Sequence, residues 1–316
     1  MDTFSAMFNT VLLFTVLLVP GYVLAKTKLI EDGAAFSFSN ILMYVAMPFL
    51  VFVKILEIDF KQVGWIGIAV SAIFPIVLSF LLVVIAKWLC KGETAQRRAC
   101  IFCATFPNCG FVGIPLAATM WPDRPQIILY VSIFNVVSTF LLLTLGVYVL
   151  SGNKDSICMK KTLVSPIFLV ILLGVPISLL RWVEYIPAVV SYSTILAQLA
   201  TPLAMIALGY ELSKIKPFKK MWTNINGYTV SLIKLIISPL ITCLLFAFLK
   251  FVLRLNIDEA LIFAMMTATA VSTAASAPAM AKKYECDAEY AASLTLINTL
   301  LCVLTLPLMY TLFSLF

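Results

Sequence analysis

Two stretches of the chain combine proline with glycines or with small polar residues in a pattern that could bind an anion. The first is PNCGFVGIP at Pro107–Pro115, and the second contains Thr267, Thr269, Ser272, Thr273, Ser276 and Pro278. A proline removes a backbone donor and clashes with the preceding turn, so each stretch is predicted to interrupt a helix. A helix that restarts at either terminal proline presents free N–H groups and about half a positive charge at its first turn. The candidate binding residues are Asn108, Cys109, Gly110, Gly113 and Pro115 in the first stretch, and Ser272, Thr273, Ser276 and Pro278 in the second.

A pair of simple proline kinks is the alternative interpretation of these stretches, because such kinks are common in membrane helices. Two observations favour a true break. Polar residues cluster before each terminal proline, and the two stretches occupy matching positions of an internal repeat. An unwound segment within a membrane is tolerated only where it lines a cavity or is buried in protein, so a pair of breaks predicts a site.

The ionisable residues favour an anion over a cation as the bound species. All 15 Asp and Glu residues lie in loops or near the ends of apolar runs, and the chain has no His. No acid is therefore expected at the membrane midplane to bind Na⁺ or relay protons. Lys234 is the one basic residue well inside an apolar run. Its ammonium group could snorkel to the membrane surface or take part in binding, and it is included among the candidate binding residues. Asn40, Tyr44 and Asn135 are weaker candidates, since an isolated polar residue more often bonds one helix to another.

Catalysis and metal binding are not indicated, and no cofactor is predicted. A zinc protease of the H-E-x-x-H type needs His, and an intramembrane aspartyl protease needs paired Asp, and both are absent. The eight cysteines fall mostly inside or at the ends of apolar runs, which predicts small buried hydrophobic side chains. Cys100 and Cys103 form a C-x-x-C pair, but without His or a second pair a zinc site is not expected.

The composition places these stretches in an integral membrane protein. Of the 316 residues, 62% are hydrophobic and only 12% are charged, whereas a soluble domain has about 25% charged residues. A helical span needs roughly 20 apolar residues, and ten such runs are present. They are Met7–Ala25, Phe36–Leu56, Val63–Leu89, Cys100–Trp121, Ile127–Leu150, Val164–Leu180, Val189–Tyr210, Tyr228–Phe251, Ala260–Ala281 and Ala291–Phe313.

Basic residues are distributed unequally between the two sets of loops. Of the 22 Lys and Arg residues, 15 lie in the loops that follow odd-numbered spans and 6 lie in the opposite loops. The positive-inside rule then places the first set in the cytoplasm and both termini outside a multi-pass plasma membrane protein. The net charge of +7 is explained by this bias, and with no solvated basic domain we expect no nucleic-acid partner.

The prolines reveal an internal repeat. Spans one to four contain Pro20, Pro48, Pro75 and Pro115, and spans six to nine contain Pro176, Pro202, Pro239 and Pro278 in the same order. Five spans per unit turn the second unit over in the membrane, which predicts an inverted repeat of the kind common in secondary transporters. The expected division is residues 1–150 for the first five-helix repeat, 151–163 for a short cytoplasmic linker and 164–316 for the second repeat.

Several motifs resemble those of the auxin efflux carrier family. PNCGFVGIPL at Pro107–Leu116 is similar to the family's motif in helix four, and PAMAKKY at Pro278–Tyr284 with LPL at Leu306–Leu308 is similar to its motifs in helices nine and ten. YVAMPFL, TPLAMIALG and a basic residue five positions before Pro239 also match, and the resemblance covers essentially the whole chain.

The resemblance implies an all-α fold of ten transmembrane helices in two inverted repeats, in which broken helices 4 and 9 cross. It further implies a homodimer through helices 1, 2, 6 and 7, an elevator movement of the rest, and contact between Asn108 and a substrate carboxylate. The short central loop resembles the microbial members, which implies small mono- or dicarboxylates. The second asparagine of some plant members is absent, because Val271 aligns with Asn108.

The leading functional prediction is therefore a secondary transporter of small organic anions in a lipid bilayer. A channel or a uniporter-like permease for another small solute is the alternative. A channel needs a continuous polar path, whereas the chain has one polar zone flanked by apolar runs, which favours a carrier.

Overall fold

The computed structural model describes residues 3–30, 34–58, 60, 63–153, 166–214, 224–252, 254 and 257–313, and the regular structure in these residues is helical. The elements of the first half are α1 (Thr3–Lys26), α2 (Ala34–Ile41), η1 (Leu42–Ala46), α3 (Met47–Leu56), α4 (Trp65–Leu89), α5 (Thr94–Thr105), η2 (Cys109–Gly113), α6 (Ile114–Met120), α7 (Pro125–Leu141), η3 (Leu142–Gly146) and α8 (Val147–Ser151). Those of the second half are α10 (Pro166–Leu179), η5 (Trp182–Tyr185), α11 (Pro187–Ala197), α12 (Ala200–Lys214), α13 (Ile225–Leu232), η6 (Ile233–Ile237), α14 (Ser238–Ala247), η7 (Phe248–Val252), α15 (Glu259–Ala270), α16 (Ala277–Lys283) and α17 (Ala288–Phe313).

Helices occupy all ten predicted apolar runs. Five helical segments are long and apolar enough to cross a membrane: Trp65–Leu89, Pro125–Ser151, Pro187–Tyr210, Ile225–Val252 and Ala288–Thr311. The other apolar helices of the described chain are shorter, so the count of ten spans stays a prediction. Most of the predicted linker at 151–163 lies outside the described residues.

Three of the repeated prolines follow a π-helical turn. Pro48, Pro115 and Pro239 are each the second residue of an α-helix that begins directly after η1, η2 or η6. Proline cannot donate a backbone hydrogen bond and crowds the carbonyl one turn earlier, so the helix widens just before it. The prolines thus do more than kink their helices, because each π turn inserts an extra residue and re-aims the side chains around it.

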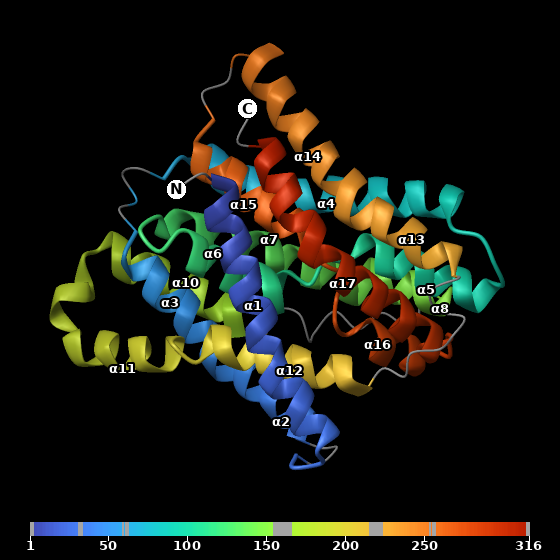
Figure 1. Ribbon diagram of the computed structural model, residues 1–316. Coiled ribbons are helices and arrows are strands. Elements are labelled where there is room, and N and C mark those ends of the chain that lie inside the picture. The colour runs from blue at the N-terminus through green and yellow to red at the C-terminus, as the bar shows by residue number, and fades with distance from the viewer. Residues whose placement is uncertain are drawn as a thin grey trace.

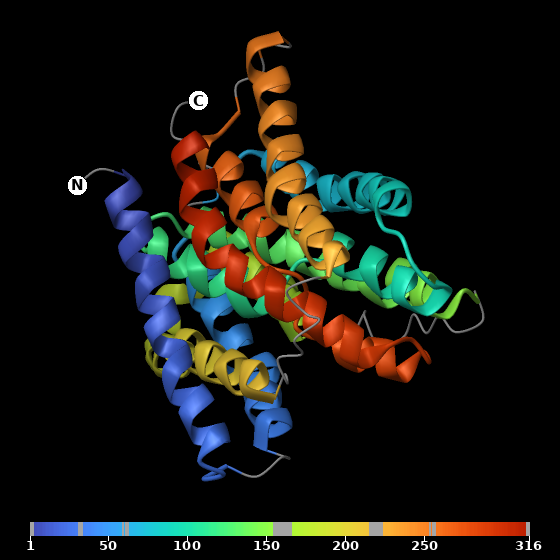
Figure 2. The same ribbon diagram turned by 45° about the vertical axis from the view of Figure 1, so that its right-hand side comes forward.

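The helices form two neighbouring groups (Figures 1 and 2). α1 crosses α12, and α3 packs against α10 and α11, on one side of the molecule. α4, α5, α13 and α16 lie on the other side, with α7 and α17 between. Glycines allow the closest approach within the first group: a side chain on Gly21 of α1 would collide with the carbonyl of Ile206, and one on Gly209 of α12 with that of Leu18. Small residues at such a crossing let membrane helices pack backbone to backbone.

The core surrounds α7, which is buried on nearly every side.

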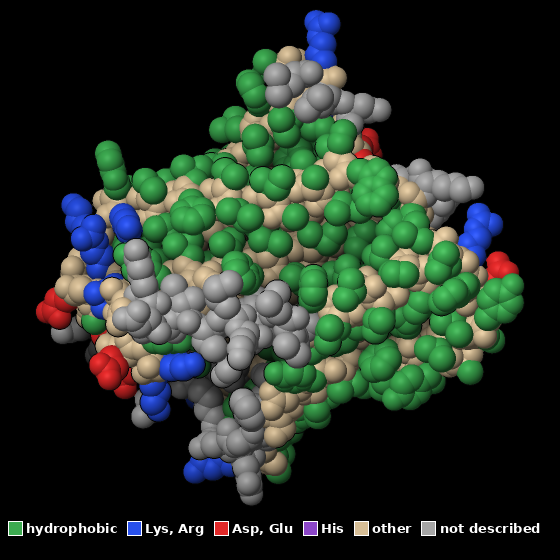
Figure 3. Space-filling model, turned by 180° about the vertical axis from the view of Figure 1, so that it is seen from behind, with side chains coloured by type: hydrophobic (Ala, Val, Ile, Leu, Met, Phe, Trp, Pro, Cys, Tyr) green, Lys and Arg blue, Asp and Glu red, His purple; other side chains and the backbone are tan. Residues whose placement is uncertain are grey.

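The outer surface is mostly hydrophobic, unlike the surface of a soluble protein. Seen from behind, hydrophobic side chains cover most of the face, and Lys, Arg, Asp and Glu lie at its edges (Figure 3). Trp65 and Trp88 near the two ends of α4 are exposed by 78% and 83%, which suits aromatic residues at membrane interfaces. This surface fits a chain whose solvent is lipid.

Candidate functional site

Both predicted breaks interrupt their helices. α5 ends at Thr105, residues 106–108 leave the helix, and a new helical segment runs from Cys109 to Met120 with Pro115 inside it. α15 ends at Ala270, residues 271–276 are irregular, and α16 begins at Ala277 with Pro278 in its first turn. The interruption of the second helix begins well before its proline, so its small polar residues, and not Pro278 alone, form the break.

The two breaks lie side by side and pair through their backbones. The Asn108 N–H donates to the Ser272 carbonyl at 2.7 Å, and the Ala274 N–H donates to the Phe106 carbonyl at 2.9 Å. Pro107 and Thr273 form an isolated antiparallel bridge between these bonds. An unwound backbone inside a membrane must find partners for its polar groups, and here each break supplies them to the other.

A polar side chain of α17 braces the second break. Asn298 is fully buried, and its side-chain oxygen accepts a hydrogen bond from the Thr273 N–H at 2.8 Å. Its amide nitrogen donates to the Ser231 hydroxyl of α13 at 3.2 Å. Asn298 therefore holds three segments together at the break. Asn298 is not among the residues predicted from the sequence, where its only signal is an amide within a predicted span.

Lys234 points into the protein and does not snorkel. Its side chain is 0% exposed, and its Nζ lies 3.5 Å from the Thr105 carbonyl at the end of α5. Ser231, Lys234, Ser238 and Thr242 follow one another at helical spacing and are all buried. This polar face continues to α15, because Thr242 donates to the Thr269 hydroxyl at 3.1 Å. One helix thus presents polar groups to both interrupted helices.

Most of the predicted binding residues gather at the paired breaks. Asn108, Ser272 and Thr273 are buried, and the Asn108 side chain makes no capping hydrogen bond to the segment that follows. Gly110 lies beside Asn135 of α7, because a methyl group on Gly110 would be in van der Waals contact with the Asn135 oxygen at 3.4 Å. The Cys109 sulfur takes the corresponding space beside Gly113, at 3.0 Å from such a methyl group. Asn135 therefore belongs with these residues more clearly than its isolated position in the sequence suggested.

Two predicted residues lie apart from this buried group. Ser276 is exposed and Pro278 is half-buried, because they begin α16 where it leaves the break. α16 has only seven residues, so its positive end is weaker than the one expected from the sequence. Among the weaker candidates, Tyr44 is 66% exposed on the surface.

A small cavity of about 60 Å³ adjoins the breaks. Its walls come from α1 and α12 on one side and from η2, α6, α17 and the second break on the other. Ser272 and Thr299 are polar groups in a mostly apolar lining, and the Thr299 hydroxyl is buried with no partner among the described residues. The lining residues are Phe14, Thr15, Leu18, Val112, Leu116, Met205, Leu208, Ser272, Thr299, Cys302, Val303 and Leu306.

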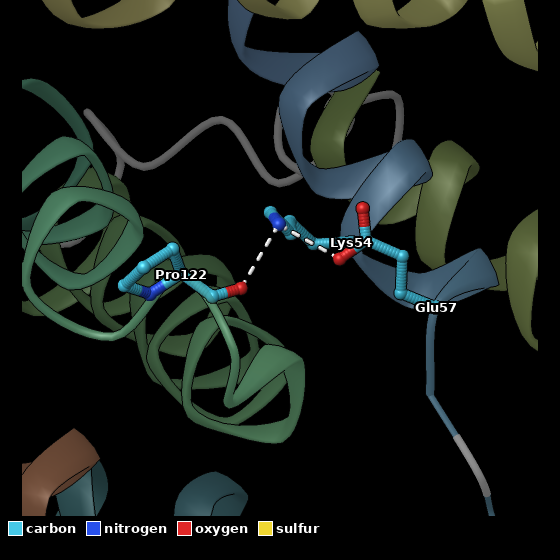
Figure 4. A network of polar contacts seen from close by, with 3 residues as sticks. All are labelled: Lys54, Glu57 and Pro122. Carbon is cyan, nitrogen blue, oxygen red and sulfur yellow. Dashed lines mark hydrogen bonds and ion pairs between the residues drawn. The ribbon is translucent and has the colours of Figure 1, made fainter.

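A second polar network joins the two groups of helices at a different place. Lys54 near the end of α3 donates to Glu57 at 2.7 Å and to the Pro122 carbonyl at 3.2 Å (Figure 4). Pro122 lies in the turn between α6 and α7. The contact therefore links the end of α3 directly to the element that follows the first break.

The predicted burial of the cysteines is confirmed for most of those that the structure describes. The described cysteines are free, and all but Cys286 are buried. Burial raises the pKa of the Cys286 thiol, which keeps it protonated at neutral pH. No group of His, Cys, Asp and Glu that could hold a metal occurs within the described residues. Cys158 lies outside them.

The model of a family described as "Membrane transport protein" matches the chain twice, at residues 6–157 and 153–310. A transporter of Methanothermobacter thermautotrophicus, named as uncharacterised, is 27% identical over 312 residues, which cover 95% of this chain and 96% of that protein. An uncharacterised transporter of Methanocaldococcus jannaschii is 26% identical over 242 residues, which cover 73% and 76%. Both relatives are transporters and neither name gives a substrate.

Proposed function

The chain belongs to the membrane transport protein family of the auxin efflux carriers, and from this premise we propose that it is a secondary transporter of small organic anions. The resemblance of its motifs to that family is thereby confirmed, and the protein is a multi-pass membrane transporter. Small mono- or dicarboxylates are the proposed substrates. The surroundings of Asn108 support an anion most strongly. This buried side chain lies at the start of a helical segment and beside a second broken helix. No acidic residue lies in the middle of a predicted span.

The proposed binding site uses the first break more than the second. A helical segment of twelve residues begins directly after Asn108, so its first N–H groups and partial positive charge face the break. The Asn108 side chain, which makes no capping bond, is available to donate two hydrogen bonds to a carboxylate. Cys109, Gly110, Gly113 and Pro115 shape that side of the site. Ser272 and Thr273 form the opposite side, and Ser276 and Pro278 extend it toward the surface, while the Lys234 amine lies behind the first break.

The proposed architecture has ten spans in two inverted repeats, residues 1–150 and 164–316, joined by a cytoplasmic linker at 151–163. The broken helices cross at the paired backbones of Pro107 and Thr273. The group containing α1, α3 and α10–α12 forms the scaffold and a homodimer interface, and the remaining helices move as an elevator in the plasma membrane. The cavity between α1 and the breaks supports this division, because it lies at the boundary between the two groups.

Ligand-dependent melting of the purified protein tests the proposal. The carrier is screened against mono- and dicarboxylates at constant ionic strength, with matched neutral amides as controls. A specific substrate stabilises the native state by RT ln(1 + [L]/Kd), about 2.7 kcal/mol at one hundred times Kd. We expect at least one carboxylate to raise the melting temperature while its amide does not. The same compound is then tested for saturable uptake and counterflow in proteoliposomes, which distinguish a carrier from a channel. Stabilisation only by neutral solutes or by cations would refute an anion carrier.

A further inference from the structure

The Lys234 amine is fully buried and forms no ion pair with the described residues. Its side chain has 0% exposure. The ion pairs of the described chain are Lys54–Glu57 and Arg124–Glu259, so neither involves Lys234. Within the described part of the chain, its hydrogen bond goes to a backbone carbonyl, that of Thr105 at 3.5 Å. A charge inside a membrane protein is costly and is retained almost only where it has a function.

The position of that carbonyl explains why the charge is tolerated. Thr105 is the last residue of α5, a helix of twelve residues. The last carbonyls of a helix lack partners within the helix and carry about half a negative charge. The ammonium group therefore lies at the negative end of the first half-helix. The adjoining positive end, after Asn108, is the one that faces the proposed anion site.

The proline that follows Lys234 helps to direct its side chain toward the end of α5. Pro239 forces the π turn of η6, which contains Lys234. Two polar residues on the same helix face form hydrogen bonds with other side chains. Ser231 accepts one from Asn298, and Thr242 donates one to Thr269. Lys234 thus contacts the end of α5 from a helix whose neighbouring side chains are bonded to α17 and α15.

Carriers with broken helices place their ligands according to these dipoles. Anionic substrate groups lie at half-helix N-termini, and coupling cations lie at half-helix C-termini and unwound carbonyls. We propose that the Lys234 ammonium is the resident cation of this carrier, occupying at the end of α5 the position that a free coupling ion would take. Lys234 is then a positioning residue, which neutralises the end of α5 and holds the first break in shape. This inference rests on the proposed function only in treating the breaks as the transport site.

Cation-dependent melting tests the proposal without a substrate. Purified wild-type protein, Lys234→Met, Lys234→Gln and Lys234→Arg are melted in NaCl, KCl and choline chloride at equal ionic strength. Wild type and Lys234→Arg are expected to melt at the same temperature in all three salts. Lys234→Met is expected to melt lower in choline and to recover by about 2–4 °C in Na⁺ or K⁺, since the vacated site then binds a free ion. The glutamine variant can still donate to Thr105 without a charge, so it provides the same comparison if the methionine variant does not fold.

Lys87→Met is the matched control, because Lys87 is exposed on α4. It is expected to behave as the wild type does in every salt. Two results would overturn the proposal: a wild-type protein stabilised by Na⁺ over choline, or neutral variants of Lys234 whose melting does not differ between the salts. Because no carboxylate is present, failure of the anion screen leaves this measurement intact, and the two proposals fail separately.

Discussion

Removing the Asn298 side chain should destabilise the second break and loosen the site. In the native protein its oxygen accepts the Thr273 N–H at 2.8 Å, and its nitrogen donates to the Ser231 hydroxyl at 3.2 Å. Asn298→Ala deletes both groups at a fully buried position. Ser231 keeps its bond to the Gly227 carbonyl at 2.9 Å, so the Thr273 N–H bears most of the loss.

The expected cost follows from that orphaned donor. A buried polar group left without a partner costs about 1–3 kcal/mol, and the space vacated by the amide adds roughly 1 kcal/mol. The sum, about 2–4 kcal/mol, corresponds to a melting temperature lower by roughly 3–6 °C for a chain of this size. The loss is local, so amide exchange should accelerate first at residues 271–276, where the backbone depends on Asn298.

Melting and hydrogen-exchange mass spectrometry of the purified protein measure both effects. Thr305→Val is the matched control on the same helix, because the Thr305 hydroxyl is buried without a partner among the described residues. Replacing such a hydroxyl by a methyl group of similar shape is expected to be neutral or slightly stabilising. An Asn298→Ala protein that melts within about 1 °C of wild type, with unchanged exchange at the break, would refute the bracing role.

Three further predictions address the site, the topology and the contact at α3. Asn108→Ala should leave the melting temperature of the apo protein unchanged but weaken binding of an identified carboxylate by roughly 10- to 150-fold, as expected for one hydrogen bond to a charged group; equal affinities would remove Asn108 from the site. Cysteine labelling should find position 316 outside and positions 160–161 inside the cell, and a cytoplasmic C-terminus would contradict the proposed orientation. Lys54→Met removes the bond to Pro122, worth about 0.5–1.5 kcal/mol, so it should shift the balance between inward- and outward-open states by roughly 2- to 12-fold. Labelling rates of single cysteines beside the cavity measure this shift, and an unchanged ratio would show that the contact does not separate during transport.

The breaks were predictable because their causes are local. The interruptions near Pro115 and Pro278 occur where proline stands with glycines or with small polar residues, whereas Pro20 and Pro75 lie inside continuous helices. The same holds for the apolar runs, since a membrane helix needs little besides length and hydrophobicity. The length of the second break was not predictable, because its residues 271–276 are held open by bonds to Phe106, Asn108 and Asn298.

The tertiary partners of single polar residues could not be read from the sequence. Lys234 bonds a carbonyl 129 positions away and Asn298 a hydroxyl 67 positions away, and neither distance leaves a periodic signal. The depth of Lys234 in its apolar run is equally consistent with snorkelling to the membrane surface and with burial in the protein. Only the position of α5, whose last carbonyl accepts its hydrogen bond, decides between the two. Ser276 matched the pattern of small polar residues equally well, yet it is exposed because α16 begins there.

A protonated Lys234 would also decide which step of the transport cycle the membrane potential drives. If Lys234 moves with the broken helices, a carrier loaded with a monoanion has no net charge at the site, whereas the empty carrier has one positive charge. Moving one charge through 100 mV changes the free energy by about 2.3 kcal/mol, which is roughly 50-fold in the equilibrium between the two orientations. An inside-negative potential would therefore draw the empty site inward and favour export of the anion. Charge movements of proteoliposomes on a solid-supported membrane measure this directly. We expect a voltage-dependent transient in the empty carrier that a saturating monoanion suppresses and that Lys234→Met lacks, whereas a transient that appears only with substrate bound would show that Lys234 does not cross the field.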